Sequence, residues 1–101
     1  MEETEVFVLT PEREMVATKI AFSELQDAFA DLAAALARLA PSTAETMVAD
    51  IGAGMQRTLR AFSDSLAPEI RDDAVLQAAA TALEGAIELA LERMAEAAKT
   101  Q

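Results

Sequence analysis

Four glutamates recur at every fourth position near the end of the chain, at Glu84, Glu88, Glu92 and Glu96. Side chains four residues apart are neighbours on a helix, so these like charges repel by roughly 0.2–0.5 kcal/mol per pair. Such a row can hold a metal ion, attract a basic partner, or only keep one face of a helix solvated. Of these three uses, the metal site demands the most specific geometry.

The row does not have that geometry. At about 100° per residue, the four glutamates span an arc of about 120° on one helix. Carboxylate ligands of Mg²⁺ or Ca²⁺ converge from facing helices, which side chains on a single face do not. The apolar residues of the same segment lie opposite the row: Leu76, Leu83, Ile87, Ala90 and Met94. We therefore expect the glutamates to face outward.

Two other acidic pairs have the spacing of a known magnesium motif, ELQD at Glu24–Asp27 and EIRD at Glu69–Asp72. This spacing resembles the paired E-x-x-E and E-x-x-D segments with which all-helical pyrophosphohydrolases hold Mg²⁺. However, the first pair straddles Leu25, an expected core position, and no E-x-x-E occurs in the expected helices. The resemblance therefore does not extend to function. We assign Glu24, Asp27 and Asp31 to an acidic surface instead.

Catalytic chemistry has few residues available in this chain, which contains no His and no Cys. Histidine is the commonest general base, and His and Cys are the usual ligands of transition metals. The serines at 23, 63 and 65 therefore lack a partner that would activate them. We expect no catalytic residue, no cofactor and no metal site, and hence no enzymatic activity.

The elements that carry these residues are predicted to be helices, because 24 of the 101 residues are alanine and only three Gly and three Pro interrupt them. Thr10 and Pro11 are typical of a helix start. Pro41 ends this first helix, and Ser42 with Glu45 has the spacing of a capping box for the second. In the segment 66–73 the third helix opens at Pro68 or at the pair of aspartates 72 and 73.

Large apolar residues repeat along the first predicted helix with a period of seven. The first series is Met15, Phe22, Phe29 and Leu36, and a second series three residues after its last three members is Leu25, Leu32 and Leu39. The apolar residues of the second predicted helix are Val48, Ile51, Met55, Leu59 and Phe62. Alanines flank the first series where a coiled coil usually has charges, which favours bundle packing. The sequence thus predicts an all-α fold of three long antiparallel helices in a bundle, residues 10–101, completed by homodimerisation.

Two segments depart from the regular pattern. Gly52 and Gly54 each cost a helix about 1 kcal/mol relative to Ala. They indicate either a close approach of two helices or a hinge or partner groove. The segment EVFVL, residues 5–9, does not fit the helices and lies in a short extended N-terminal arm over residues 1–9. It forms a short strand, covers the first helix, or is exchanged with another subunit.

The third predicted helix has a second apolar line, Val75, Ala82 and Leu89, with Leu91 at its far edge. Its apolar arc approaches about 200°, wider than the roughly 100° of an ordinary surface helix. A helix that is apolar over so wide an arc is central or is shared with another chain. We therefore expect these four residues to form a subunit contact, with a symmetric dimer as the commonest closure.

The net charge of −10 limits the partners. Residues 1–40 carry three basic and eight acidic side chains, residues 41–68 two and three, and residues 69–101 three and seven. Such a surface repels nucleic acid and anionic membranes and attracts basic proteins. The acidic N-terminus and the absence of an apolar run of about 18 residues favour a soluble, cytoplasmic protein.

Three functions fit these features. The first is a non-enzymatic interaction or assembly module that forms homo-oligomers. The second is a small acidic inhibitor that mimics nucleic acid and blocks the basic groove of a nucleic-acid-binding enzyme, as phage-type antagonists do. The third is an amphipathic coat on a hydrophobic surface, which the scarcity of Lys and Arg disfavours.

Overall fold

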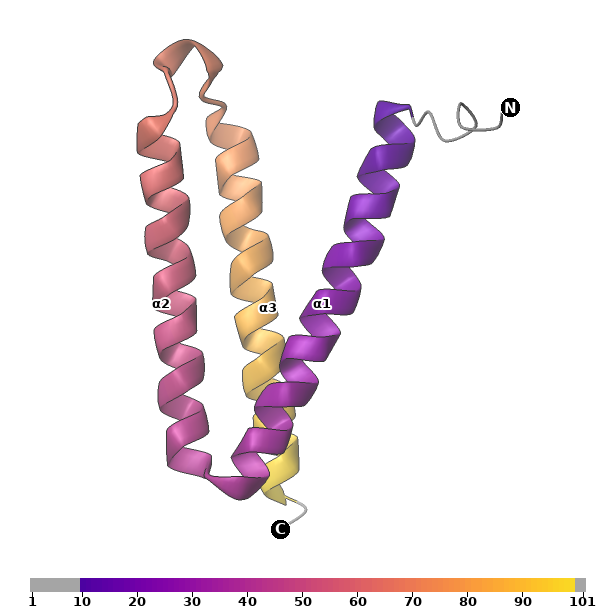
Figure 1. Cartoon of the computed structure of the whole chain (residues 1–101), viewed down its shortest axis with the longest axis vertical. Helices are drawn as coiled ribbons and strands as arrows, with labels where there is room; N and C mark the ends of the chain where they lie inside the picture. Colours follow the sequence, from indigo (N-terminus) through magenta and orange to yellow (C-terminus); the bar gives the residue numbers. More distant parts are fainter. Residues whose placement is uncertain (1–9, 100–101) are drawn as a thin grey trace, which may run out of the picture.

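The computed structural model describes residues 10–99 and contains three long helices (Figure 1). Helix α1 spans Pro11–Leu39, α2 spans Pro41–Ser65 and α3 spans Asp73–Lys99, with a short 3₁₀ helix, η2, at Pro68–Ile70. No strand occurs in the described part of the chain, so the all-α prediction is confirmed. The predicted arm over residues 1–9 lies outside the described residues.

Local sequence signals account for the start of α1. The Oγ1 atom of Thr10 accepts a hydrogen bond from the backbone N–H of Arg13 at 3.2 Å, and Pro11 occupies the first helical position. Glu12 and Glu14 lie in the first turn, where the helix dipole favours negative charge. The predicted start at Thr10 and Pro11 is therefore confirmed.

The start of α2 differs from the prediction. Ala40 alone separates α1 from α2 and acts as the N-cap without a side-chain hydrogen bond, while Ser42 lies inside the first turn. The predicted capping box of Ser42 and Glu45 is therefore wrong. Proline fits the first helical position because its φ is preset and its missing N–H is not needed there. Pro41 thus begins the helix ahead of the capping-box position.

The connection from α2 to α3 uses the aspartate start and not the proline start. The Oδ1 atom of Asp72 accepts hydrogen bonds from the backbone N–H groups of Ala74 and Val75 at 3.0 and 3.3 Å. Pro68 opens η2 instead. The Nη2 atom of Arg71 donates to the carbonyl of Leu66 at 3.0 Å and ties the two sides of the connection together.

The core lies at one end of the molecule and consists mainly of alanine. One residue from each helix is 0% exposed: Ala30 of α1, Ala44 of α2 and Ala90 of α3. The same cluster contains Ala33, Ala37, Val48 and Met94. Because α1 and α2 are joined through the single residue Ala40, their ends must approach closely, and small side chains permit this approach.

Away from this core, α1 separates from the other two helices. Figure 1 shows α2 and α3 side by side along their length, while α1 crosses α3 near the core and then diverges from it. Every residue from 11 to 21 is exposed. The first helix is therefore packed through its C-terminal part and uncovered over its N-terminal part.

The predicted core face of α1 is wrong. Leu25, Leu32 and Leu39 are 69%, 68% and 84% exposed, and only Phe29 and Leu36 of the predicted series pack against the core. Alanines occupy the buried face instead, at Ala30, Ala33, Ala34 and Ala37. At about 100° per residue, the buried face is rotated by roughly 100° from the predicted one. The close junction of the helices selects small side chains over large ones.

Helix α3 is only partly covered by its neighbours. Over an 18-residue window it has a mean hydropathy of 1.4, enough by length and composition alone for a membrane-spanning helix, and 11% of that window is buried. The expectation of a soluble protein rested on the absence of a long uninterrupted apolar run. Helix α3 meets the membrane criterion without such a run, because the criterion tolerates a few charged residues. This finding agrees with the interpretation that α3 carries more apolar surface than three helices bury.

Candidate interaction surfaces

The glutamate row lies on the exposed side of α3. Glu84, Glu88, Glu92 and Glu96 are all exposed, and Glu96 accepts a hydrogen bond from the Nζ atom of Lys99 at 3.4 Å. Among residues 10–99, no group of three or more acidic side chains is placed to hold a metal ion. The row therefore forms a continuous acidic surface of about three helical turns.

Two members of the predicted acidic surface on α1 are joined to α3. The Nη1 atom of Arg93 contacts the Oδ1 atom of Asp31 at 2.6 Å, and its Nη2 atom contacts the Oδ1 atom of Asp27 at 3.1 Å. The side chain of Arg93 is 36% exposed, so this ion-pair group contributes at most about 1 kcal/mol. Its main effect is to orient α1 on α3. Glu24 remains exposed.

Sequence reasoning missed the role of Arg93. Arg93 is an isolated basic residue beside the acidic row, and nothing near it in the sequence indicates a contact. Its two partners lie 62 and 66 residues earlier in the chain. The spacing of Asp27 and Asp31 was the available signal. Side chains four residues apart share one helix face and can receive both ends of one guanidinium group.

The predicted subunit contact on α3 is divided between two environments. Val75 is 61% exposed and Ala82 is also exposed, whereas Leu89 is partly buried and packs against the core. Leu91 is 45% exposed. Leu89 therefore serves the internal packing of the chain, and the free part of this line is its N-terminal half.

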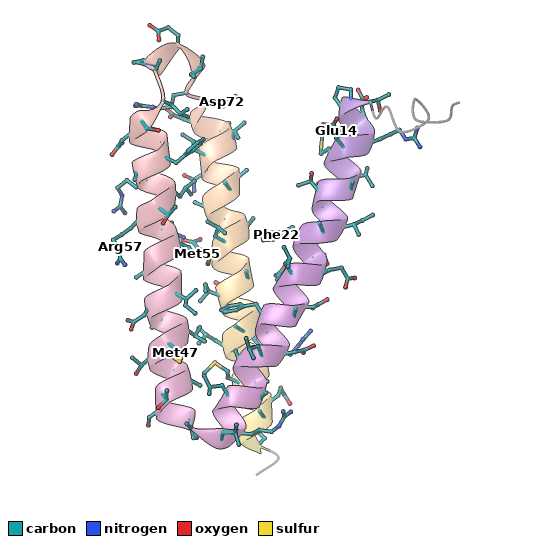
Figure 2. The ribbon with its side chains drawn as sticks, viewed as in Figure 1. Glu14, Phe22, Met47, Met55, Arg57 and Asp72 are labelled. Atoms are coloured by element: carbon teal, nitrogen blue, oxygen red, sulfur yellow. The ribbon has the colours of Figure 1, made fainter. Side chains whose placement is uncertain are left out.

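An open groove of about 820 Å³ runs along α2 beyond the core, and α3 borders it through Leu83. Its lining residues are mostly apolar: Ile51, Gly54, Met55, Thr58, Leu59, Ala61, Phe62 and Leu83, together with Arg57. Figure 2 shows Met55 on the side of α2 that faces α3, and Arg57 on the opposite side, at the outer edge of the helix. We call this feature the α2–α3 groove.

The groove continues the core along the same stripe of α2. Val48 is 3% exposed within the core, and Ile51, Met55 and Phe62 follow it at helical spacing into the groove. Ile51 and Phe62 are 41% and 56% exposed. The stripe is thus buried where α1 is present and uncovered where α1 has diverged.

The two glycines of α2 have different surroundings. A Cβ atom built on Gly52 would lie 3.3 Å from Cγ1 of Ile87, so Gly52 permits the close approach of α2 to α3. At Gly54 the nearest atom to such a Cβ is Nη2 of Arg57, at 3.6 Å, and Gly54 lines the groove. The interpretation of a close helix approach therefore holds for Gly52.

The sequence offered a partner groove at Gly52 and Gly54 as an alternative to a close helix approach, and Gly54 lines the α2–α3 groove. Four other lining residues had been predicted as the apolar face of the second helix: Ile51, Met55, Leu59 and Phe62. The bundle prediction did not include the divergence of α1 from α2 and α3 beyond the core. Comparison of the chain with models of known protein families, with curated proteins and with solved structures finds no match.

Proposed function

We propose that this protein is a non-enzymatic interaction or assembly module of the cytoplasm that works as a homo-oligomer, with a dimer as the basic unit. In this proposal, association completes an antiparallel three-helix bundle whose helices are incompletely covered in the single chain. The observation that carries the proposal is that small side chains are buried and large apolar ones are exposed, the opposite of an ordinary core. Small alanines fill the core, while large leucines lie in solvent.

The exposed apolar surface supports this proposal energetically. Twelve large apolar side chains of the described residues are at least 41% exposed. Full burial of one such side chain is worth about 1.5–3 kcal/mol relative to exposure. On α1, Leu25, Leu32 and Leu39 recur every seven residues and form one line, as the side chains at a helix–helix contact do.

Light scattering coupled to size-exclusion chromatography tests the proposal. We expect the wild-type chain to elute as a dimer or larger assembly and Leu25→Glu, which changes an exposed member of the leucine line, to shift it toward monomer with its helix content preserved. Thr46→Glu is the matched control, because it adds the same charge at an exposed position of α2 and should leave the mass unchanged. A monomeric wild-type chain over a wide range of concentration would overturn the proposal.

The predicted contact of Val75, Ala82, Leu89 and Leu91 remains part of the proposal. Val75→Glu is a sharper test of it than a change at Leu89, because Leu89 also packs against the core of its own chain. A loss of association in Val75→Glu would place the subunit contact at the N-terminal half of α3.

A second candidate function is that of a small acidic inhibitor of a protein with a basic groove. The exposed row of Glu84, Glu88, Glu92 and Glu96 favours it, together with the net charge of −10. Such binding weakens steeply with salt, because it depends on charges at the surface. Two results would support this function. The wild-type chain captures a basic protein at low salt, and the variant that combines Glu88→Gln with Glu92→Gln fails to capture it.

A further inference from the structure

We propose that the α2–α3 groove holds residues 11–25 of α1 from a second copy of this chain. This inference rests on the proposed self-association and names the two surfaces that bring the copies together. We call residues 11–25 the outer segment of α1.

The groove lacks a third helix. Close to the core, the apolar stripe of α2 is covered by both α1 and α3, and Val48 is 3% exposed there. Further along the same stripe, Ile51 and Phe62 line the groove and are 41% and 56% exposed. A helix placed in the groove would continue the three-helix packing of the core to the other end of α2.

The outer segment has the composition and length of such a helix. It carries Met15, Val16 and Ile20, each at least 57% exposed, and Leu25, which is 69% exposed. Its 15 residues span about 22 Å at 1.5 Å per residue, and the stretch of α2 from Ile51 to Phe62 spans about 18 Å. Phe22 lies between Ile20 and Leu25 in this segment, and Figure 2 shows it on the side of α1 that faces the other two helices.

The charges of the two surfaces are complementary. On a chain with a net charge of −10, residues 51–62 of α2 carry Arg57 and Arg60 and no acidic residue. Arg57 is the charged residue among those that line the groove. The outer segment carries three acidic residues and two basic ones. The outer segment, with a net charge of −1 (two basic against three acidic residues), would thus meet a part of α2 with a net charge of +2.

Exchange between two copies satisfies both surfaces at once. Each chain has one groove and one outer segment, so a two-fold axis lets each copy fill the groove of the other and leaves neither surface open. A stable interface buries about 1,200–2,000 Å² in total, and a reciprocal exchange contributes each contact twice. A single contact between α1 helices would leave the groove uncovered.

Cysteine cross-linking tests the exchange without interference, because the natural chain contains no Cys. Thr18 is central in the outer segment and Thr58 lines the groove, and both are exposed. Thr18→Cys and Thr58→Cys are prepared as separate chains, mixed, and treated with a short thiol-reactive cross-linker. Each chain then carries one Cys, so any link between positions 18 and 58 joins two chains. We expect this link to be the main heterodimeric product.

Thr81→Cys is the matched control, since Thr81 is exposed on α3 and does not line the groove. Mixed with Thr18→Cys, it should give at least about ten times less of the linked product. A double variant of one chain, Thr18→Cys with Thr58→Cys, reports whether α1 folds back onto its own groove. An intrachain link at low concentration, with no interchain link in the mixture, would overturn the inference.

The two proposals fail in different ways. If the wild-type chain is dimeric by light scattering but positions 18 and 58 do not link, the exchange is wrong and the proposed self-association stands. If the wild-type chain is monomeric, both are wrong. Linking between positions 18 and 58 in the mixture, together with a dimeric mass, supports both.

Discussion

At the scale of single residues, the fold depends on side chains that are small. Ala30, Ala44 and Ala90 belong to the core where the three helices converge and are each 0% exposed, so a larger side chain at any of them would have to displace its neighbours. Gly52 has the same role between α2 and α3, since even a methyl group there comes within 3.3 Å of Ile87. Gly54, two residues later, has no such neighbour.

This difference between the glycines predicts a contrast in stability. Replacing Gly54 by Ala should raise the free energy of unfolding by up to about 1 kcal/mol, because alanine is the better helix former and the nearest atom is the flexible tip of Arg57. Replacing Gly52 by Ala should give a smaller gain or a loss, because Cγ1 of Ile87 must move. Urea unfolding, followed by circular dichroism at several dilutions, measures both. An equal gain in the two variants would show that α2 and α3 are not closely packed at Gly52.

At the scale of the helix, local signals in the sequence predicted the start of α1 and offered the right start of α3 as one of two, but they did not predict the start of α2 or the buried face of α1. The starts at Thr10 and Asp72 were predictable, because in each a side-chain oxygen accepts hydrogen bonds from one or two backbone N–H groups of the first turn. The buried face of α1 was not, because a seven-residue apolar repeat fits a contact with the same chain and a contact with another chain equally well. The one-residue connection at Ala40 decides between them, since it brings the alanine face inward.

Because α1 buries its alanine face, substitutions in the seven-residue apolar series should differ in their effect on the free energy of unfolding. Phe29 is partly buried against the core, so Phe29→Ala should lower the free energy of unfolding of the dilute chain by roughly half of the 3–5 kcal/mol typical of a buried Phe. Leu25 is 69% exposed, so Leu25→Ala should change it by less than about 0.5 kcal/mol.

Thermal and urea unfolding of the two variants, at concentrations where light scattering detects only monomer, provides the comparison. Leu36→Ala serves as a second partly buried reference. If Leu25→Ala were as destabilising as Phe29→Ala in the monomer, α1 would have to present its leucine face to the core, as the apolar repeat alone predicts.

At the scale of the whole molecule, charge and apolar surface act in opposite directions on association. Two copies with a net charge of −10 each repel one another, while their exposed leucines and grooves attract. The ion pairs between α1 and α3 are exposed and contribute little to this balance. The strength of association should therefore depend on how far the repulsion extends through the solvent.

Salt should strengthen self-association. Between about 0.1 M and about 1 M salt the screening length falls from about 10 Å to about 3 Å, which removes most of the repulsion and leaves apolar attraction in place. We expect the dissociation constant of the dimer, measured by sedimentation equilibrium, to stay constant or to fall a few-fold over this range. Glu88→Gln with Glu92→Gln should bind more tightly at low salt and respond less to added salt. Dissociation by salt would instead mean that charge attraction between the copies, such as that between the outer segment of α1 and Arg57 or Arg60, outweighs the repulsion between their net charges.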